Sequence, residues 1–160
     1  MLWREAGRVL DQMHVREKLR SNGQIARLSA TEVTVSSALF MQSSRAEAMA
    51  AQQLVTQAFN AAEVGQPYSL ETQIKRRMAS QQIRSEFSEA ELVHRYLETT
   101  YLGEGEYGLA AASGSMFGKR PEDLTKDEAL TLAAVIRQPS LRSDPEKLAL
   151  RVAKDKERNE

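Results

Sequence analysis

The stretch from residue 88 to residue 119 constrains the fold more than any other part of the sequence. Ser88 and Glu91 form a Ser-x-x-Glu pattern, in which each side chain bonds a backbone N–H at the start of a helix. Apolar residues then recur at helical spacing, which predicts a helix with one buried face. A glycine-rich loop at 101–108 ends that helix, because glycine adopts positive φ and allows close backbone approach. A second helix follows and ends in the Phe-Gly-Lys sequence of residues 117–119.

Length and composition favour one all-α domain. The chain has 160 residues, enough to bury a proper core, and we expect a single domain over residues 1–160. Proline and glycine are few before residue 100, and aromatic residues are scarce. Lysine plus arginine and aspartate plus glutamate number 22 each, so net charge does not direct the chain to nucleic acid. Cysteine is absent, which excludes disulfides and thiolate chemistry.

We expect roughly seven helices. The first covers residues 2–20 and is interpreted as a packing helix; a helix lying on a membrane surface, with Trp3 at the headgroups, is the alternative. A second Ser-x-x-Glu pattern at 29–32 opens the next helix, although β-branched residues leave a short strand at 33–35 as an alternative. A further helix is expected at about 46–62, and after a break at Gly65-Gln66-Pro67 another helix is expected that includes Ile83. The central stretch contributes two helices. The last two are expected to begin at the Thr125/Glu128 capping pair and at Pro145.

The sequence shows no pattern of a membrane anchor or a metal site. No apolar run approaches the ~20 residues that a transmembrane helix needs. Leu2-Trp3 is followed at once by Arg4-Glu5, so we expect no signal peptide and no transmembrane segment. His14 and His94 are expected to be solvent-facing helix residues, and their separation predicts no metal site. No cofactor is evident from the residues alone.

The residue order of the central stretch carries a resemblance. It contains Tyr96-Leu97, Tyr101, glycines at 103 and 105, and Tyr107-Gly108, and it ends in the Phe-Gly-Lys sequence; a Leu-Thr-x-x-Glu-Ala sequence, Pro139 and Pro145 follow. This order resembles the family 51 glycosyltransferases, the peptidoglycan-polymerising domain of class A penicillin-binding proteins. The resemblance covers roughly residues 83 to 159. It implies a lysozyme-like helical fold, lipid II or a glycan strand as partner, a divalent metal as in many members, and a place in the cell envelope.

The resemblance also indicates which residues bind substrate. Gln52-Gln53, followed by Leu54 and Phe59, resembles the end of the family's Gly-x-Ser-Thr-Ile-x-Gln-Gln motif, which lines the cleft. The basic run at 75–77 has two interpretations, a solvated helix face or a contact to diphosphate or an anionic sugar. The predicted substrate-binding residues are Gln52, Gln53, Lys75, Arg77, Tyr101, Gly103, Gly105, Tyr107, Gly108 and Lys119.

Both glutamates that perform catalysis in the resembled family lack a counterpart in this sequence. The motif of the first, Glu-Asp-x-x-Phe-x-x-His, does not occur, and counting back from Ser88 the second falls on Arg76. An arginine stays protonated and cannot replace a carboxylate as a base. Glu98 is a weak candidate for a substitute. We therefore predict a degenerate glycosyltransferase-like domain whose activity is uncertain, and the alternative is a non-catalytic helical module that binds glycan or a cell-wall enzyme.

Overall fold

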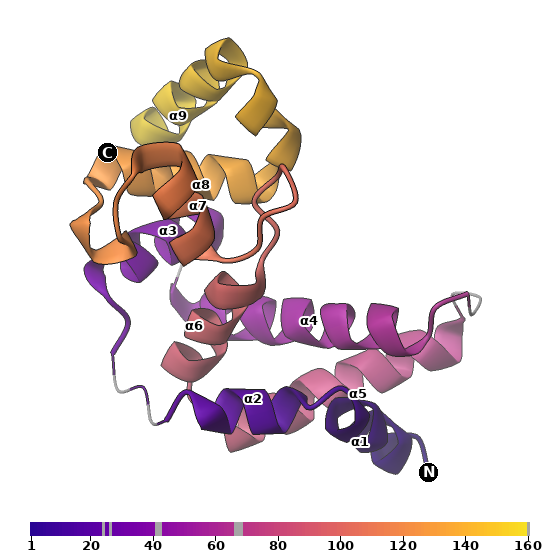
Figure 1. Ribbon diagram of the computed structural model, residues 1–160. Helices are drawn as coiled ribbons and strands as arrows, with labels where there is room; N and C mark the ends of the chain where they lie inside the picture. Colours follow the sequence, from indigo (N-terminus) through magenta and orange to yellow (C-terminus); the bar gives the residue numbers. More distant parts are fainter. Residues whose placement is uncertain (24, 26, 41–42, 66–68, 160) are drawn as a thin grey trace. The chain divides into compact units, whose positions relative to one another are not determined.

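The computed structural model describes residues 1–23, 25, 27–40, 43–65 and 69–159. Over these residues the chain is all-α, as predicted, and contains no strand; Tyr101 and Tyr107 form an isolated β-bridge. The helices are shown in Figure 1, and their bounds are α1 Leu2–Gln12, α2 Val15–Ser21, α3 Ala30–Phe40, α4 Ser43–Ala62, α5 Leu70–Glu86, α6 Glu89–Thr99, α7 Leu109–Phe117, the 3₁₀-helix η1 Pro121–Asp123, α8 Lys126–Arg137, the 3₁₀-helix η2 Pro139–Ser143, and α9 Pro145–Asn159.

The chain divides into two compact units, each made of two segments. The first consists of Met1–Arg27 and Ser44–Tyr96, and the second of Leu28–Ser43 and Leu97–Glu160. Helix α6 begins in the first unit and ends in the second. Each unit has its own buried core and is described separately below.

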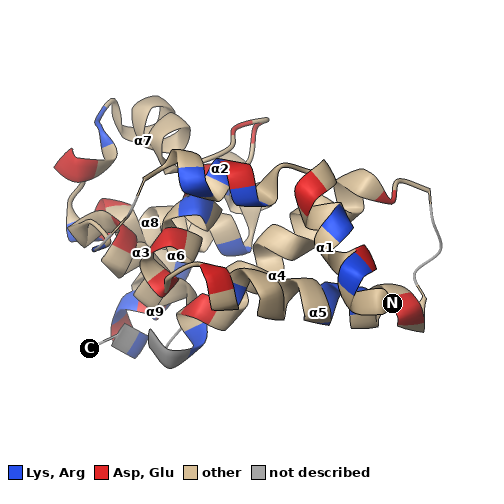
Figure 2. Cartoon of the chain, turned by 90° about the horizontal axis from the view of Figure 1, so that it is seen from below, with Lys and Arg blue, Asp and Glu red and all other residues tan. Residues whose placement is uncertain are grey.

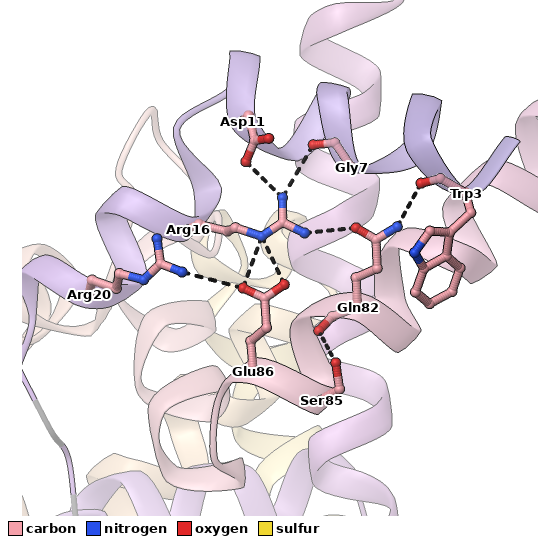
Figure 3. Close-up of polar contacts among 8 residues, drawn as sticks. All are labelled: Trp3, Gly7, Asp11, Arg16, Arg20, Gln82, Ser85 and Glu86. Atoms are coloured by element: carbon pink, nitrogen blue, oxygen red, sulfur yellow. Dashed lines mark hydrogen bonds and ion pairs between the residues drawn. The ribbon is translucent and has the colours of Figure 1, made fainter. Parts of the chain in front are cut away.

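In the first unit, α1 packs on α5 through Ala6 and Leu10, which are fully buried. A polar network joins α1 and α2 to α5, and Figure 3 shows the Arg16 guanidinium at its centre. Arg16 donates to the Glu86 carboxylate at 2.9 and 3.0 Å and to Gln82 Oε1 at 2.7 Å. Gln82 is itself buried and donates to the backbone oxygen of Trp3 at 2.7 Å. The network satisfies polar groups that burial would otherwise leave unpaired.

In the second unit, α8 is the central helix. It packs against α3 and α9 and buries an almost continuous apolar run over residues 129–135, as expected of a helix covered on several sides. Thr31 Oγ1 on α3 donates to the Pro121 backbone oxygen at 2.6 Å. At the other end of α3, the Arg137 guanidinium donates to the Ala38 backbone oxygen and forms an ion pair with Asp155 at 3.3 Å.

All three predicted capping patterns are present. Ser29 and Glu32, Ser88 and Glu91, and Thr125 and Glu128 each exchange the two reciprocal side chain-to-backbone hydrogen bonds. These motifs are local, so a short stretch of sequence contains all the partners that they need.

Three expectations were wrong, and one alternative is excluded. There are nine α-helices in the described ranges rather than roughly seven. The helix expected at 2–20 is broken at His14, which adopts left-handed φ of 54°, so this exposed residue lies between helices. The alternative strand at 33–35 is part of α3, where the Ser29 cap begins a helix and Val35 faces the core. Helix α4 begins at Ser43 rather than near residue 46.

The apolar side of α1 packs against α5, in agreement with the packing interpretation of that segment. The predicted break at Gly65-Gln66-Pro67 is only partly visible, because Gln66 and Pro67 lie outside the described residues; Gly65 has φ of 80°, which suits a turn. No helix in the described ranges is long and apolar enough to cross a bilayer.

Candidate functional site

A groove of about 460 Å³ lies between α4 and α5 in the first unit. The two helices supply stripes at helical spacing: positions 48, 52, 55 and 56 on α4, and positions 73, 76, 77, 80, 81 and 84 on α5. Figure 2 shows α4 largely uncharged, with basic positions on α5. The lining residues are Ala48, Gln52, Val55, Thr56, Gln73, Arg76, Arg77, Ser80, Gln81 and Arg84.

Arginines give the groove its chemical character. Arg76 donates to Asn60 Oδ1 at 2.8 Å, and its guanidinium carbon lies 5.7 Å from the centre of the Phe59 ring, so α4 holds its side chain from two sides. Arg84 is tied to Glu47 on α4 at 3.2 Å. Amide and hydroxyl side chains also line the groove. Such a surface offers many hydrogen-bond donors with positive charge, which suits an anionic group.

The structure separates the residues that were predicted to act together at 75–77. Gln52, Arg76 and Arg77 line the same groove. Lys75 instead forms ion pairs with Glu71 at 2.7 Å and with Glu5 of α1 at 2.9 Å. Hydrogen bonds to Glu71 and to Glu5 raise the pKa of Lys75 to about 12. Lys75 therefore joins α1 to α5, because it lies on the face of α5 that is turned toward α1.

The predicted glycine loop lies in the second unit and is closely folded. Gly103, Gly105 and Gly108 have φ between 79° and 88°. The Leu102 N–H donates to the Glu106 backbone oxygen at 2.9 Å, and the Gly108 N–H donates to that of Thr100 at 2.8 Å. A Cβ on Gly108 would collide with the Glu98 carbonyl, so glycine is required there by sterics as well as by φ. Tight packing is therefore a sufficient reason for this glycine.

Arg142 organises this loop, and sequence reasoning missed it. Its side chain is only 6% exposed and donates to the backbone oxygens of Leu102 and Gly103 at 3.1 and 3.2 Å. It also pairs with the carboxylates of Glu104 at 3.3 Å and Glu106 at 2.9 Å. The only sequence signal was the position of Arg142 between the two prolines of the motif.

The comparisons with known proteins identify the family. The sequence model of the family described as "Transglycosylase" matches residues 35–159, more than half of the chain. The chain belongs to this transglycosylase family. It corresponds to the glycosyltransferase family 51 domain of class A penicillin-binding proteins.

Individual relatives match a shorter part of this transglycosylase chain. Penicillin-binding protein 1A of Rickettsia felis is 39% identical over 72 residues, which are 45% of this chain and 9% of that protein. Penicillin-binding protein 1A of Mycobacterium tuberculosis is 46% identical over 55 residues, 34% of this chain and 7% of that protein. Penicillin-binding protein 2D of Bacillus subtilis is 41% identical over 58 residues, 36% of this chain and 8% of that protein. The matched segments thus span a tenth or less of these relatives.

Other predicted site residues have structural partners within this transglycosylase fold. Lys119 Nζ pairs with Glu128 at 2.8 Å, and the same carboxylate completes the cap of α8. Glu98 is exposed at the end of α6. Gln53 is half-buried on α4 and is not among the described residues that line the groove. The role of these residues toward a substrate stays a prediction.

The groove does not fit a divalent cation. Magnesium and calcium prefer carboxylate and other oxygen ligands, whereas the described lining offers three guanidinium groups and no carboxylate. In the described part of the chain, no three histidine, cysteine, aspartate or glutamate residues lie close enough together to hold a metal ion.

Proposed function

We propose that this chain is a transglycosylase domain that binds lipid II or its glycan product without polymerising it. The groove between α4 and α5 is the observation that carries the proposal. It contains Gln52 of the partial Gln-Gln motif, and its described lining has Arg76 at the position expected for a catalytic glutamate and no carboxylate.

The chemistry of glycosyl transfer supports a binding role. The attacking sugar hydroxyl must lose its proton to a base in or near the transition state. A guanidinium remains protonated in proteins and cannot accept this proton. Arg76 is also held in place by Asn60 and Phe59. The first catalytic motif of the family is absent from the sequence.

Arginine in place of glutamate changes what the groove binds best. Guanidinium groups form paired, charge-assisted hydrogen bonds with phosphate and carboxylate oxygens. Arg76 and Arg77 both line this groove from α5. The diphosphate of lipid II is the anionic group that we assign to them.

The proposed function also concerns the domain organisation and the cellular location of the chain. We infer that the two units form one lysozyme-like transglycosylase domain, and that it acts at the cell envelope, where lipid-linked peptidoglycan precursors are found. Gln53 of the first unit, and Lys119 and the glycine loop of the second, stay predicted substrate contacts. Glu98, the weak candidate for a substitute carboxylate, has no catalytic role in this proposal.

Binding of lipid II to groove variants tests the assignment. We expect Arg76→Gln and Arg77→Gln each to weaken binding about ten- to a hundredfold, because each removes a charge-assisted contact worth about 1.5–3 kcal/mol. Arg120→Gln is the matched control, since this arginine is highly exposed in the second unit. Inorganic diphosphate should compete with lipid II. Equal affinity of the parent and both groove variants would show that the groove is not the binding site.

A further inference from the structure

One of the arginines that line the groove is already paired with a carboxylate. Arg84 Nε on α5 donates to Glu47 Oε1 on α4 at 3.2 Å, so the ion pair links the two helices that form the groove. A guanidinium that holds a carboxylate has the charge and the geometry to hold another anionic group. The Glu47 side chain therefore marks Arg84 as an anion-binding position.

Arg84 lies some way along the groove from the position that we assign to diphosphate. Arg77 and Arg84 are about two helical turns apart on α5, and both line the groove. At a rise of about 1.5 Å per residue, their Cα atoms are roughly 10 Å apart along the helix axis. The two positions therefore suit a ligand with two separate anionic groups better than they suit one diphosphate.

The ion pair between Arg84 and Glu47 is easily exchanged. Its side chains are 42% and 31% exposed, and exposed ion pairs add little net stability because water and salt screen them. The Arg16–Glu86 pair of the same unit differs, since the Arg16 side chain is only 15% exposed and its Nε donates to both Glu86 oxygens. Displacement of Glu47 from Arg84 releases the carboxylate to solvent and leaves no buried charge.

We propose that Arg84 is a second anion-binding position of the groove and that Glu47 occupies it in the ligand-free chain. The ligand class is a molecule that carries a phosphate or carboxylate about 10 Å beyond the group bound by Arg76 and Arg77. Such a ligand displaces Glu47, whose negative charge otherwise opposes anions at this end of the groove. This inference rests on the proposed function, because it takes diphosphate as the group at Arg76 and Arg77.

Calorimetric titration with inorganic diphosphate and with linear decaphosphate tests the second position, because only decaphosphate is long enough to reach both. We expect Glu47→Gln to strengthen decaphosphate binding about fivefold and to change diphosphate binding by less than about twofold. Arg84→Gln should weaken decaphosphate binding about tenfold in the Glu47→Gln background, but less in the parent, where Glu47 already occupies Arg84. Glu17→Gln is the matched control, since it removes the same charge from an exposed side chain of the same unit.

The outcomes separate this inference from the proposed function. Equal decaphosphate binding by the parent and Glu47→Gln, or an equal gain from Glu17→Gln, would overturn the second position alone. Equal effects of Arg84→Gln in the parent and in the Glu47→Gln background would do the same. Unchanged lipid II binding in both Arg76→Gln and Arg77→Gln would instead overturn the proposed function. A larger effect of Arg84→Gln in the Glu47→Gln background supports the second position, even in a chain that is found to polymerise lipid II.

Discussion

Two glycines of one loop should respond very differently to the same substitution. Gly103 has φ of 80° and Gly105 has φ of 79°. Alanine at either position should therefore destabilise the folded chain by a similar amount, roughly 1–2 kcal/mol, through backbone strain. The surroundings differ. A Cβ on Gly103 would lie 2.8 Å from the Pro139 carbonyl oxygen, whereas a Cβ on Gly105 would meet nothing within 4 Å.

The expected difference in stability between the two variants follows from the contact with Pro139. The Pro139 oxygen belongs to the backbone and cannot rotate away, so Gly103→Ala also overpacks the site, at about 1–3 kcal/mol. The difference between the two variants should be about 2 kcal/mol. For a chain of this length that corresponds to roughly 4–8 °C in melting temperature. Valine at either position should destabilise further, with the same ranking.

Thermal unfolding followed by circular dichroism compares the parent with both variants. Hydrogen exchange of the Leu102 amide, which bonds to the Glu106 backbone oxygen in the loop, reports on the loop itself. We expect faster exchange and a lower melting temperature for Gly103→Ala than for Gly105→Ala. Equal melting temperatures would refute the argument that contact with Pro139, rather than φ alone, requires glycine at 103.

Three further predictions concern stability. Arg142→Met should cost about 1–3 kcal/mol in chemical unfolding, because it removes a donor from the buried backbone oxygens of Leu102 and Gly103. Arg120→Met at an exposed site should leave the unfolding midpoint unchanged. Hydrogen bonds from Lys119 and the Thr125 N–H lower the pKa of Glu128 below 4.5. In this pH range the folded chain therefore binds fewer protons at Glu128 than the unfolded chain does. The stabilisation from these hydrogen bonds is complete above about pH 4.5, and it is lost as the pH falls through the lower pKa of Glu128 in the folded chain. Urea titrations between about pH 7 and pH 3 should show that the free energy of unfolding falls less on acidification in Glu128→Gln than in the parent. An equal decrease in both proteins would contradict this. Thr125→Ala should cost about 1 kcal/mol through loss of the α8 cap, and no change in unfolding midpoint would mean that the cap is not needed.

Local features of this fold were predictable from sequence. The capping pairs needed only residues three positions apart, and the glycine loop was evident because only glycine adopts positive φ at low cost. The break at His14 was not predictable in the same way. No glycine or proline marks it, and the turn brings Arg16 into the polar network with α5.

The candidate site was predictable only in part. The family resemblance indicated Gln52 and Arg76, and the structure places both in one groove. Helical spacing shows that Lys75 shares a face of α5 with Gln82 and Glu86, but only the structure shows that this face meets α1 and α2. The role of Arg142 could not be predicted from the sequence, for a different reason. The contacts of its guanidinium with the loop and with Ser115 are 27 to 40 residues away in sequence, and no local pattern encodes them.

An assay of lipid II polymerisation by the purified chain distinguishes a binding domain from an active glycosyltransferase. The parent and Arg76→Glu are incubated with lipid II, and glycan products are separated by gel electrophoresis, with circular dichroism confirming that both proteins are folded. From the proposed function we expect the parent to bind lipid II and to make no glycan product, because the Arg76 guanidinium in the groove cannot act as a base. Glycan strands made by the parent would contradict the account and require a carboxylate elsewhere in the chain to act as the base.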